Sequence, residues 1–323
     1  MDSSRAAAVN HPATAKGVPL FAVMVAVTMW SLSALTIRAA HADPLRYVAW
    51  RALLSLPVLG LILAVRSRRR SAPLIVLAPG VTPVRWLLTI VGAGAVFTAS
   101  AVLGFGAVNR TALLDNAIIS SLQPILVVAA AVLFLGEASD HSNWVRAGAA
   151  VVGTILVVTA NAAGAHHDAI GIAMAVAALG LNVIWYLYGR WLRSTFDVDP
   201  VALMLGVLTS VAVILTPIAW ISAGTMYLPL ETLGWATTTM VVGTGAHLCS
   251  MWAHRYVPAS ISSLFLLAQA PIIGLAAWWA FGERPAAIQV VGTIVVLGAL
   301  AGVVRSQTIA HVDETVEDSI PAT

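Results

Sequence analysis

"SSLQPILVVAAAVLFLGE", residues 120–137, is an almost entirely apolar stretch that carries a glutamine and a proline near its start and ends on Gly-Glu. The second half of the chain repeats this design as "LLAQAPIIGLAAWWAFGE", residues 266–283. Gln123 and Gln269 each lie fourteen residues before the closing glutamate. Apolar stretches of this length are typical of membrane-spanning helices, and their recurrence predicts a chain built from two related halves.

The composition is that of a membrane protein and excludes a large water-soluble core. Hydrophobic residues make up 59% of the 323 residues and charged residues 10%, and the mean hydropathy is +0.91. A soluble domain has about 25% charged residues, so this chain has too few to cover a water-facing surface. The net charge of +3 forms no basic stripe, and no nucleic-acid partner is expected. Cys249 is the single cysteine, so no internal disulfide is possible.

Ten apolar runs approach the length of about 20 residues that crosses a bilayer. The first begins at Val18 and is interpreted as a retained span, because it is longer than the signal-peptide core of about 7–15 residues. Polar tails are expected at 1–17 and 305–323. The predicted fold is all-α, with transmembrane helices at 18–38, 44–65, 86–108, 112–135, 144–161, 168–190, 200–222, 232–253, 257–281 and 286–304.

Lysine and arginine are distributed unevenly between the predicted loops. With the N-terminus inside, cytoplasmic segments hold twelve of them and external segments hold four, Arg38, Arg46, Arg110 and Arg284, while Arg51 lies within a span. Positive residues accumulate on the cytoplasmic side of membranes. Both termini are therefore expected in the cytoplasm, with the chain in a bacterial-type cell membrane.

Further short sequences recur in the two halves. Asp43-Pro44 precedes the second span and Asp199-Pro200 the seventh, and "VVGTI" occurs at 151–155 and again at 290–294. Each half holds five spans, and an odd number makes the second copy enter the membrane inverted relative to the first. We therefore expect one five-helix repeat at 18–161 and an inverted one at 168–304.

This arrangement resembles the EamA-type branch of the drug/metabolite transporter superfamily. The residues that carry the resemblance are Gln123-Pro124 with Gly136-Glu137, Gln269 and Pro271 with Gly282-Glu283, Trp30 in the first span and Arg51 in the second. One departure is Pro271, which lies one residue nearer its glutamate than Pro124 does. The resemblance covers nearly the whole membrane part. It implies export of amino acids, metabolites or drugs without indicating which.

The prolines predict kinks in the fourth and ninth spans. A proline inside a helix lacks an N–H and clashes with the carbonyl four residues back, so Pro124 and Pro271 each free one backbone carbonyl. Gln123 and Gln269 lie roughly 16–18 Å into their spans, near the midplane. A freed carbonyl beside an amide is a candidate substrate contact. The alternative is a glutamine that only joins two helices.

Polar and aromatic residues near the middle of the first and sixth spans are further candidates for substrate binding. Trp30 and Ser31 lie about twelve residues into the first span. Asn182 and Tyr186 are four residues apart in the sixth and share a helix face, with Trp185 beside them. This face offers stacking surface and hydrogen bonds to an amphipathic solute. The alternative is simple packing of the aromatic rings against a neighbouring helix.

Ionisable groups inside spans are costly and therefore informative. Arg51 and Asp115 both lie near the external ends of their spans, so an ion pair between them is geometrically possible. The interpretations are a structural pair or snorkelling to the interface, and a part in gating, substrate binding or proton transfer. His247, in the eighth span, is a candidate proton carrier or a neutral hydrogen-bond donor. The His-His-Asp sequence at 166–168 is interpreted as a solvated loop, and no metal site is predicted.

The glycines and glutamates at helix ends are interpreted as structural residues. Glu137 and Glu283 each follow a glycine that ends a helix, and they are interpreted as matched helix-end fasteners at the cytoplasmic and external faces. Glycines within the spans, such as Gly94, Gly243 and Gly245, are expected at close helix contacts.

The sequence contains no P-loop, no H-E-x-x-H or G-x-S-x-G motif and no cysteine cluster, so no enzyme and no cofactor is predicted. We expect a secondary transporter of small amphipathic metabolites, such as amino acids. It would export them by alternating access around a midplane cavity lined by the first, fourth, sixth and ninth spans. Its partners would be the small-molecule substrate and the lipid bilayer, with proton coupling left open, in a monomer or homodimer. The alternatives are a flippase or membrane enzyme for lipid-linked substrates, and a non-transporting membrane scaffold.

Overall fold

The computed structural model describes residues 17–69, 75–76, 82–123, 125–126, 130, 145, 168–195, 197–253, 268–284, 287, 290–295 and 298. These ranges contain the helices α1 (Gly17–Ala40), α2 (Pro44–Arg69), α3 (Pro83–Arg110), α4 (Leu113–Ser120), α7 (Ala169–Thr195), α8 (Pro200–Ala223), α9 (Leu230–Ala253) and α11 (Gln269–Phe281). Strands β1 (Ile75–Val76) and β2 (Asp197–Val198) form a two-stranded antiparallel ladder. The fifth predicted span lies outside the described residues except for residue 145, and the tenth is described only in part.

Repeated Asp-Pro pairs begin two of the long helices. Asp43 accepts a hydrogen bond from the backbone N–H of Arg46 at 3.0 Å as α2 starts. Asp199 accepts one from the N–H of Val201 at 2.9 Å as α8 starts. In both helices proline occupies the first position, where a missing N–H costs nothing and its fixed φ suits the helix. The equivalent helices of the two halves therefore start in the same way.

Several helices are long and apolar enough to cross a membrane. Within the described residues, four reach a full span, at Phe21–Ala40, Pro44–Arg69, Pro83–Arg110 and Pro200–Ala223. Shorter apolar stretches run along α7 (Ala169–Trp185) and α11 (Ile272–Phe281). Large apolar side chains face outward, with Trp279 89%, Ile221 81% and Val213 68% exposed. An apolar surface of this kind is stable in contact with lipid and not with water. The chain is therefore a multi-pass membrane protein.

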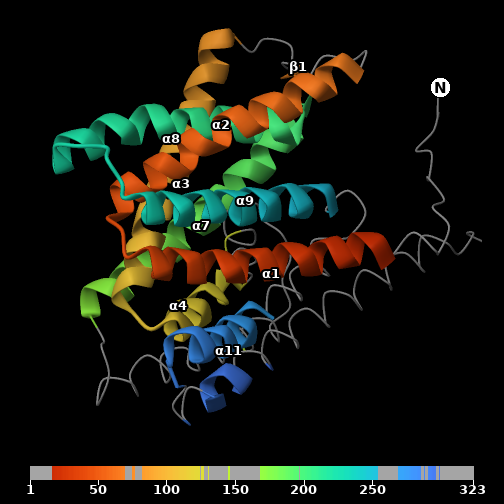
Figure 1. Ribbon diagram of the computed structural model, residues 1–323. Helices are drawn as coiled ribbons and strands as arrows, with labels where there is room; N and C mark the ends of the chain where they lie inside the picture. Colours follow the sequence, from red (N-terminus) through yellow and green to blue (C-terminus); the bar gives the residue numbers. More distant parts are fainter. Residues whose placement is uncertain are drawn as a thin grey trace, which may run out of the picture.

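Helix contacts follow a two-fold exchange (Figure 1). The pairs are α1 with α9, α3 with α7, α2 with α8, α3 with α8, α2 with α9, α1 with α11, α4 with α7, α4 with α11, α2 with α3, and α8 with α9. Exchanging α1, α2 and α3 with α7, α8 and α9 reproduces the contacts among these six helices, apart from the one between α1 and α3. The minor contacts that α3 makes with α1 and α4 fall outside the exchange. Two halves related by pseudo-symmetry would pack in this way.

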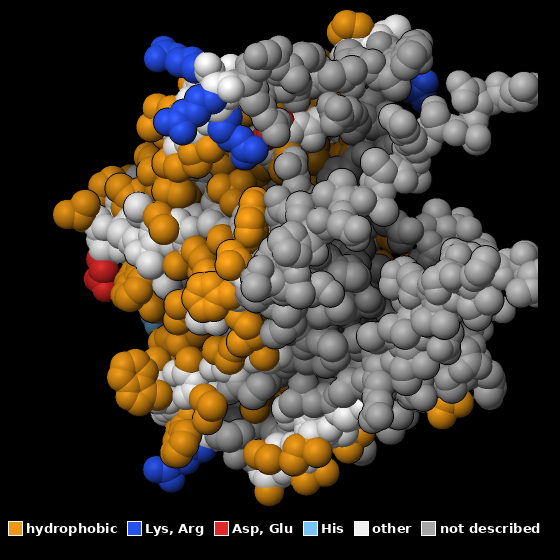
Figure 2. Space-filling view, turned by 90° about the vertical axis from the view of Figure 1, so that its right-hand side faces the viewer, with side chains coloured by type: hydrophobic (Ala, Val, Ile, Leu, Met, Phe, Trp, Pro, Cys, Tyr) orange, Lys and Arg blue, Asp and Glu red, His pale blue; other side chains and the backbone are white. Residues whose placement is uncertain are grey.

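The two ends of the helix array carry different charged residues. At the Arg38 end, on the left of Figure 1, α1 ends and α2 begins. At the Arg66 end α2 finishes with Arg66, Arg68 and Arg69. Figure 2 views the molecule from the Arg66 end, where arginine side chains lie at the edge of a surface rich in hydrophobic ones. There Arg66 pairs with the nearly fully buried Asp199 at 3.3 Å, beside the β1–β2 ladder.

Candidate functional site

Arg51 lies on α2 and is only 7% exposed. Its guanidinium lies over the ring of Phe105 from α3, with Cζ 5.6 Å from the ring centroid. It also faces Gly243 of α9: a Cβ at this position would lie 2.7 Å from Nη2 of Arg51. Glycine lowers helix stability, but here it leaves the space that the guanidinium fills.

A chain of buried hydroxyl groups lies one helical turn from Arg51 and joins three helices. The hydroxyl of Tyr47 (α2) lies 2.7 Å from Oγ1 of Thr239 (α9), which lies 2.7 Å from Oγ1 of Thr36 (α1). Thr36 donates to the carbonyl of Ser33 at 2.8 Å. Each hydroxyl has one proton, so every group donates once if Tyr47 donates to Thr239 and Thr239 to Thr36. Polar groups in hydrocarbon need such partners.

An aromatic group continues the site along α9, one turn after Gly243. The ring of His247 meets Trp30 of α1 edge to face, with centroids 5.3 Å apart. Phe97 of α3 lies 6.1 Å from His247 and 5.1 Å from Trp185 of α7, again with steep angles between the rings. These are favourable aromatic geometries. Phe97 was not among the site residues predicted from the sequence. Its ring joins Trp185 to the contact between Trp30 and His247, three residues that were predicted.

We call Arg51, Tyr47, Phe105, Thr239 and Gly243 the Arg51 cluster, and Trp30, Phe97, Trp185 and His247 the aromatic group. Tyr47 and Phe105 are also in ring contact, with centroids 5.9 Å apart. Together the two sets draw on five helices, α1, α2, α3, α7 and α9. They combine one cation, several hydroxyls and a set of rings inside the helix array, which suits a solute with both polar and apolar parts.

Other predicted binding residues have different surroundings. Ser31 is fully buried, but its hydroxyl donates to the carbonyl of Val27 at 2.9 Å within α1. Asn182 is half-buried on α7, three residues before Trp185. The side chain of Tyr186 lies outside the described part of the structure.

The glutamine and proline motifs lie at interruptions of helices. Regular helix α4 ends at Ser120, four residues before Pro124, and the next turn is tightened by a 3.1 Å bond from the N–H of Leu122 to the carbonyl of Ile119. Pro124 itself lies outside the described residues. Gln123 follows this break and is half-buried.

In the second half, Gln269 is the first residue of α11 and is also half-buried. Pro271 lies in the first turn of this helix, where no intrahelical N–H bond is lost. Since α11 packs against α4, the helix that begins at Gln269 contacts the helix that ends just before Gln123.

Arg51 and Asp115 are not brought together. Asp115 is fully buried on α4, which packs against α7 and α11. Arg51 faces Phe105 of α3 and Gly243 of α9 instead. The described residues accordingly contain no Arg51–Asp115 ion pair. Similar distance from the ends of two helices did not place the two side chains on facing surfaces.

Glu283 connects three segments at the Arg38 end. Its Oε1 accepts a 2.7 Å hydrogen bond from Arg38, and its Oε2 accepts one from the N–H of Leu113 at 3.0 Å. Arg38 also donates to the carbonyl of Thr111 at 2.7 Å. Ala112 provides no side-chain cap for α4, so Glu283 satisfies an N–H in its first turn. Glu137, the matching glutamate of the first half, lies outside the described residues.

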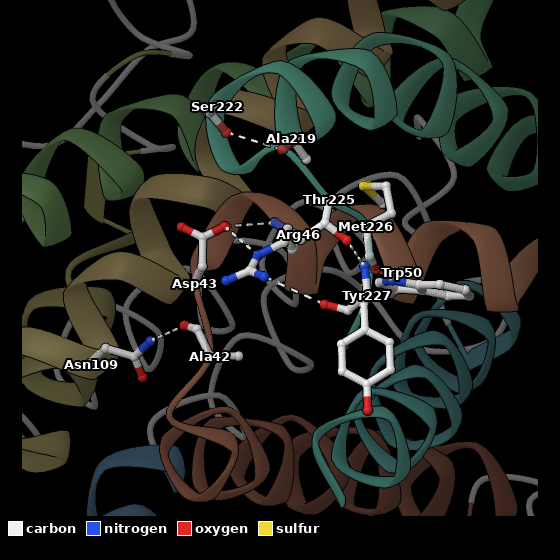
Figure 3. Close-up of polar contacts among 10 residues, drawn as sticks. All are labelled: Ala42, Asp43, Arg46, Trp50, Asn109, Ala219, Ser222, Thr225, Met226 and Tyr227. Atoms are coloured by element: carbon white, nitrogen blue, oxygen red, sulfur yellow. Dashed lines mark hydrogen bonds and ion pairs between the residues drawn. The ribbon is translucent and has the colours of Figure 1, made fainter. Parts of the chain in front are cut away.

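The first turns of α2 hold the connection between α8 and α9 at the same end (Figure 3). Nε1 of Trp50 donates to the carbonyl of Met226 at 2.6 Å, and Arg46 to that of Tyr227 at 3.4 Å. Asn109, at the end of α3, donates to the carbonyl of Ala42 at 3.1 Å. Hydrogen bonds from side chains to the backbone carbonyls of the loops therefore stabilise the Arg38 end.

Comparisons with known proteins agree with the fold. The model of the EamA-like transporter family matches residues 17–159 and 169–305. A search of curated proteins gives no match. A solved crystal structure of another protein has 17% sequence identity and a TM-score of 0.59, covering 94% of this chain and 99% of the other. At this identity the likeness shows the fold alone.

Proposed function

The chain belongs to the EamA-like transporter family and is a membrane transporter of the drug/metabolite superfamily; from this premise we propose that it is a secondary transporter of small amphipathic metabolites, such as amino acids or related compounds. The single observation that supports this proposal most is the position of the buried Arg51 against Gly243, one turn of α9 before His247 of the aromatic group. Binding sites for small solutes combine a few placed polar groups with apolar walls.

Alternating access is the proposed mechanism, and the two-fold exchange of helix contacts supports it. In inverted repeats, one half rocks against the other around a central site. The substrate would bind between Trp30, Trp185 and the Arg51 cluster, with Gln123 and Gln269 contributing from the kinked helix pair. Breaking the Glu283 contacts would free the Arg38 end, and breaking the Arg66–Asp199 pair would free the opposite end.

The Arg38 end would face outward and the Arg66 end the cytoplasm, because α2 ends in three arginines and positive residues accumulate inside. Both termini would then be cytoplasmic in a cell membrane, and transport would run outward. The buried Asp115 and the half-buried His247 are the protonatable groups proposed for proton coupling. Facilitated diffusion needs neither of them.

Reconstituted protein tests the proposal. A thermal-shift screen of amino acids, nucleosides, cationic drugs and lipid-linked precursors identifies ligands that bind the folded state. Counterflow of the best ligand into proteoliposomes should follow, and Trp30→Ala should reduce it strongly, whereas Trp279→Ala, which changes a lipid-facing tryptophan, should not. If an imposed pH gradient leaves the transport rate unchanged, proton coupling is excluded. Stabilisation only by lipid-linked compounds would favour a flippase or membrane enzyme.

A further inference from the structure

Arg51 differs from the paired arginines of this structure in its position. The ion pairs among the described residues all lie at helix ends: Arg38 with Glu283, Arg46 with Asp43, Arg66 with Asp199, and Arg110 with Asp168. Arg51 lies within α2 and is more than nine-tenths buried. Its Nε has no hydrogen-bond partner, and no ion pair joins the guanidinium to a described residue.

No described residue supplies an anion to compensate the charge of Arg51. Among the described residues, the ionisable side chains close enough to interact with its charge are Tyr47 on α2 and His247 on α9. The ring of Phe105 contributes a cation–π contact on one side. A cation inside hydrocarbon needs an opposite charge or water, and these neighbours supply only neutral groups.

The geometry favours a planar anion as the missing partner. A guanidinium presents a rigid fork of N–H donors that matches the two oxygens of a carboxylate. Because Gly243 has no side chain, Nη2 of Arg51 lies directly against the α9 helix, which fixes where the fork is presented. One turn further along α9, His247 and Trp30 offer ring surfaces for the apolar body of the same molecule.

We propose that Arg51 binds the carboxylate of the transported compound, so that the substrates are small carboxylates with an apolar or aromatic body. This assignment rests on the transport function proposed above and narrows it. Zwitterionic amino acids and simple carboxylic acids fit the site. Cations are rejected, because they would meet the like charge of Arg51.

Binding of benzoate to the purified full-length protein tests the assignment. Thermal shift at constant ionic strength should show stabilisation by benzoate and much less by benzamide or benzylammonium, which keep the ring and lack the anion. Arg51→Gln should weaken benzoate binding by about tenfold or more. Arg110→Gln is the matched control, because it removes an arginine from an exposed pair at a helix end and should leave benzoate affinity unchanged.

A glycine pair on α9 tests the same geometry with the charge of Arg51 intact. A Cβ at Gly243 displaces only the flexible end of Arg51, so Gly243→Ala should fold and yet weaken benzoate binding severalfold. Gly245→Ala, two residues away, instead meets the terminal methyl of Met29 at 2.5 Å and should bind benzoate like the unchanged protein.

The outcomes separate this inference from the proposed function. Absence of benzoate stabilisation, equal stabilisation in Arg51→Gln, or binding of phenyl phosphate in place of benzoate would each overturn the carboxylate assignment. If benzoate binding depends on Arg51 but no flux occurs in proteoliposomes, the carboxylate-binding role of Arg51 is supported and the proposed transport function is overturned. Flux of a neutral or cationic solute that Arg51→Gln leaves unchanged would support transport and overturn the role of Arg51.

Discussion

Arg38 and Glu283 lie 245 positions apart in the chain and form a 2.7 Å ion pair where α1 and α11 end. The second carboxylate oxygen of Glu283 binds the N–H of Leu113 at the start of α4. One side chain from the second half of the chain therefore fastens two helices of the first half. Any motion that separates these helices at the Arg38 end must break both contacts.

Glu283→Gln should lower the thermal stability of the purified protein. The amide keeps the shape of the side chain but loses the charge that attracts Arg38 and the partial positive charge at the start of α4. Because the pair is partly exposed, we expect a loss of about 1 kcal/mol, measured as a fall in the unfolding temperature. Asp168→Asn, which weakens an exposed pair with Arg110 at the same end, should cost less.

Labelling should detect opening of the same end. In a Cys249→Ser background, a cysteine placed at Thr36 lies buried below the Glu283 contacts. Adding Glu283→Gln should increase its rate of reaction with a membrane-impermeant maleimide, because the open state becomes more populated. An unchanged rate would contradict a role for Glu283 in holding this end closed.

Asp168 provides a test based on pH. The hydrogen bond from Arg110 lowers the pKa of the Asp168 carboxyl below its ordinary value of 3.8, and the N–H of Ile170 adds to this effect. A lowered pKa stabilises the fold above pH 3.8, and this contribution is lost as the pH falls through the folded-state value. Unfolding measured against pH should therefore show less acid sensitivity in Asp168→Asn. Because the pair lies at the solvent-accessible surface, high salt should reduce the difference.

Thr239→Val should interrupt the hydroxyl chain while keeping the side-chain shape. Tyr47 then loses its hydrogen-bond acceptor inside the helix array. We expect a loss of about 1 kcal/mol in the free energy of unfolding, together with slower counterflow, because Tyr47 lies one turn from Arg51. Thr238→Val changes the neighbouring exposed threonine, whose hydroxyl bonds only the carbonyl of Gly234, and should leave transport unchanged. Equal effects of the two substitutions would argue against a role for the chain in the site.

The sequence predicted the helices well where local chemistry decides them. Long apolar runs and Asp-Pro starts placed α2 and α8 within a few residues, because these signals act within one segment. The regular helix α4 ends at Ser120, four residues before Pro124, whereas the sequence predicted a single span at 112–135 with a kink at Pro124.

Side-chain partners between helices were less accessible to sequence reasoning. The sequence allowed an ion pair between Arg51 and Asp115, whereas in the structure Arg51 lies against Phe105 and Gly243. The contact between Tyr47 and Thr239 was not anticipated, although threonines inside a span were a usable signal. Such contacts depend on the rotation and register of neighbouring helices, which no single segment encodes.

Gly94 gives a final test, of packing between α3 and α8. A Cβ on Gly94 would collide with Cβ of Ser210 and lie 3.2 Å from the backbone carbonyl of Val207, so the helices would have to move apart. Gly94→Ala should therefore destabilise the protein by about 1–3 kcal/mol, despite the better helix propensity of alanine. Gly234→Ala on α9 has no atom within 4 Å of the new Cβ and should raise stability by about 0.5–1 kcal/mol. If both substitutions raise the unfolding temperature alike, α3 and α8 do not approach as closely as the structure shows.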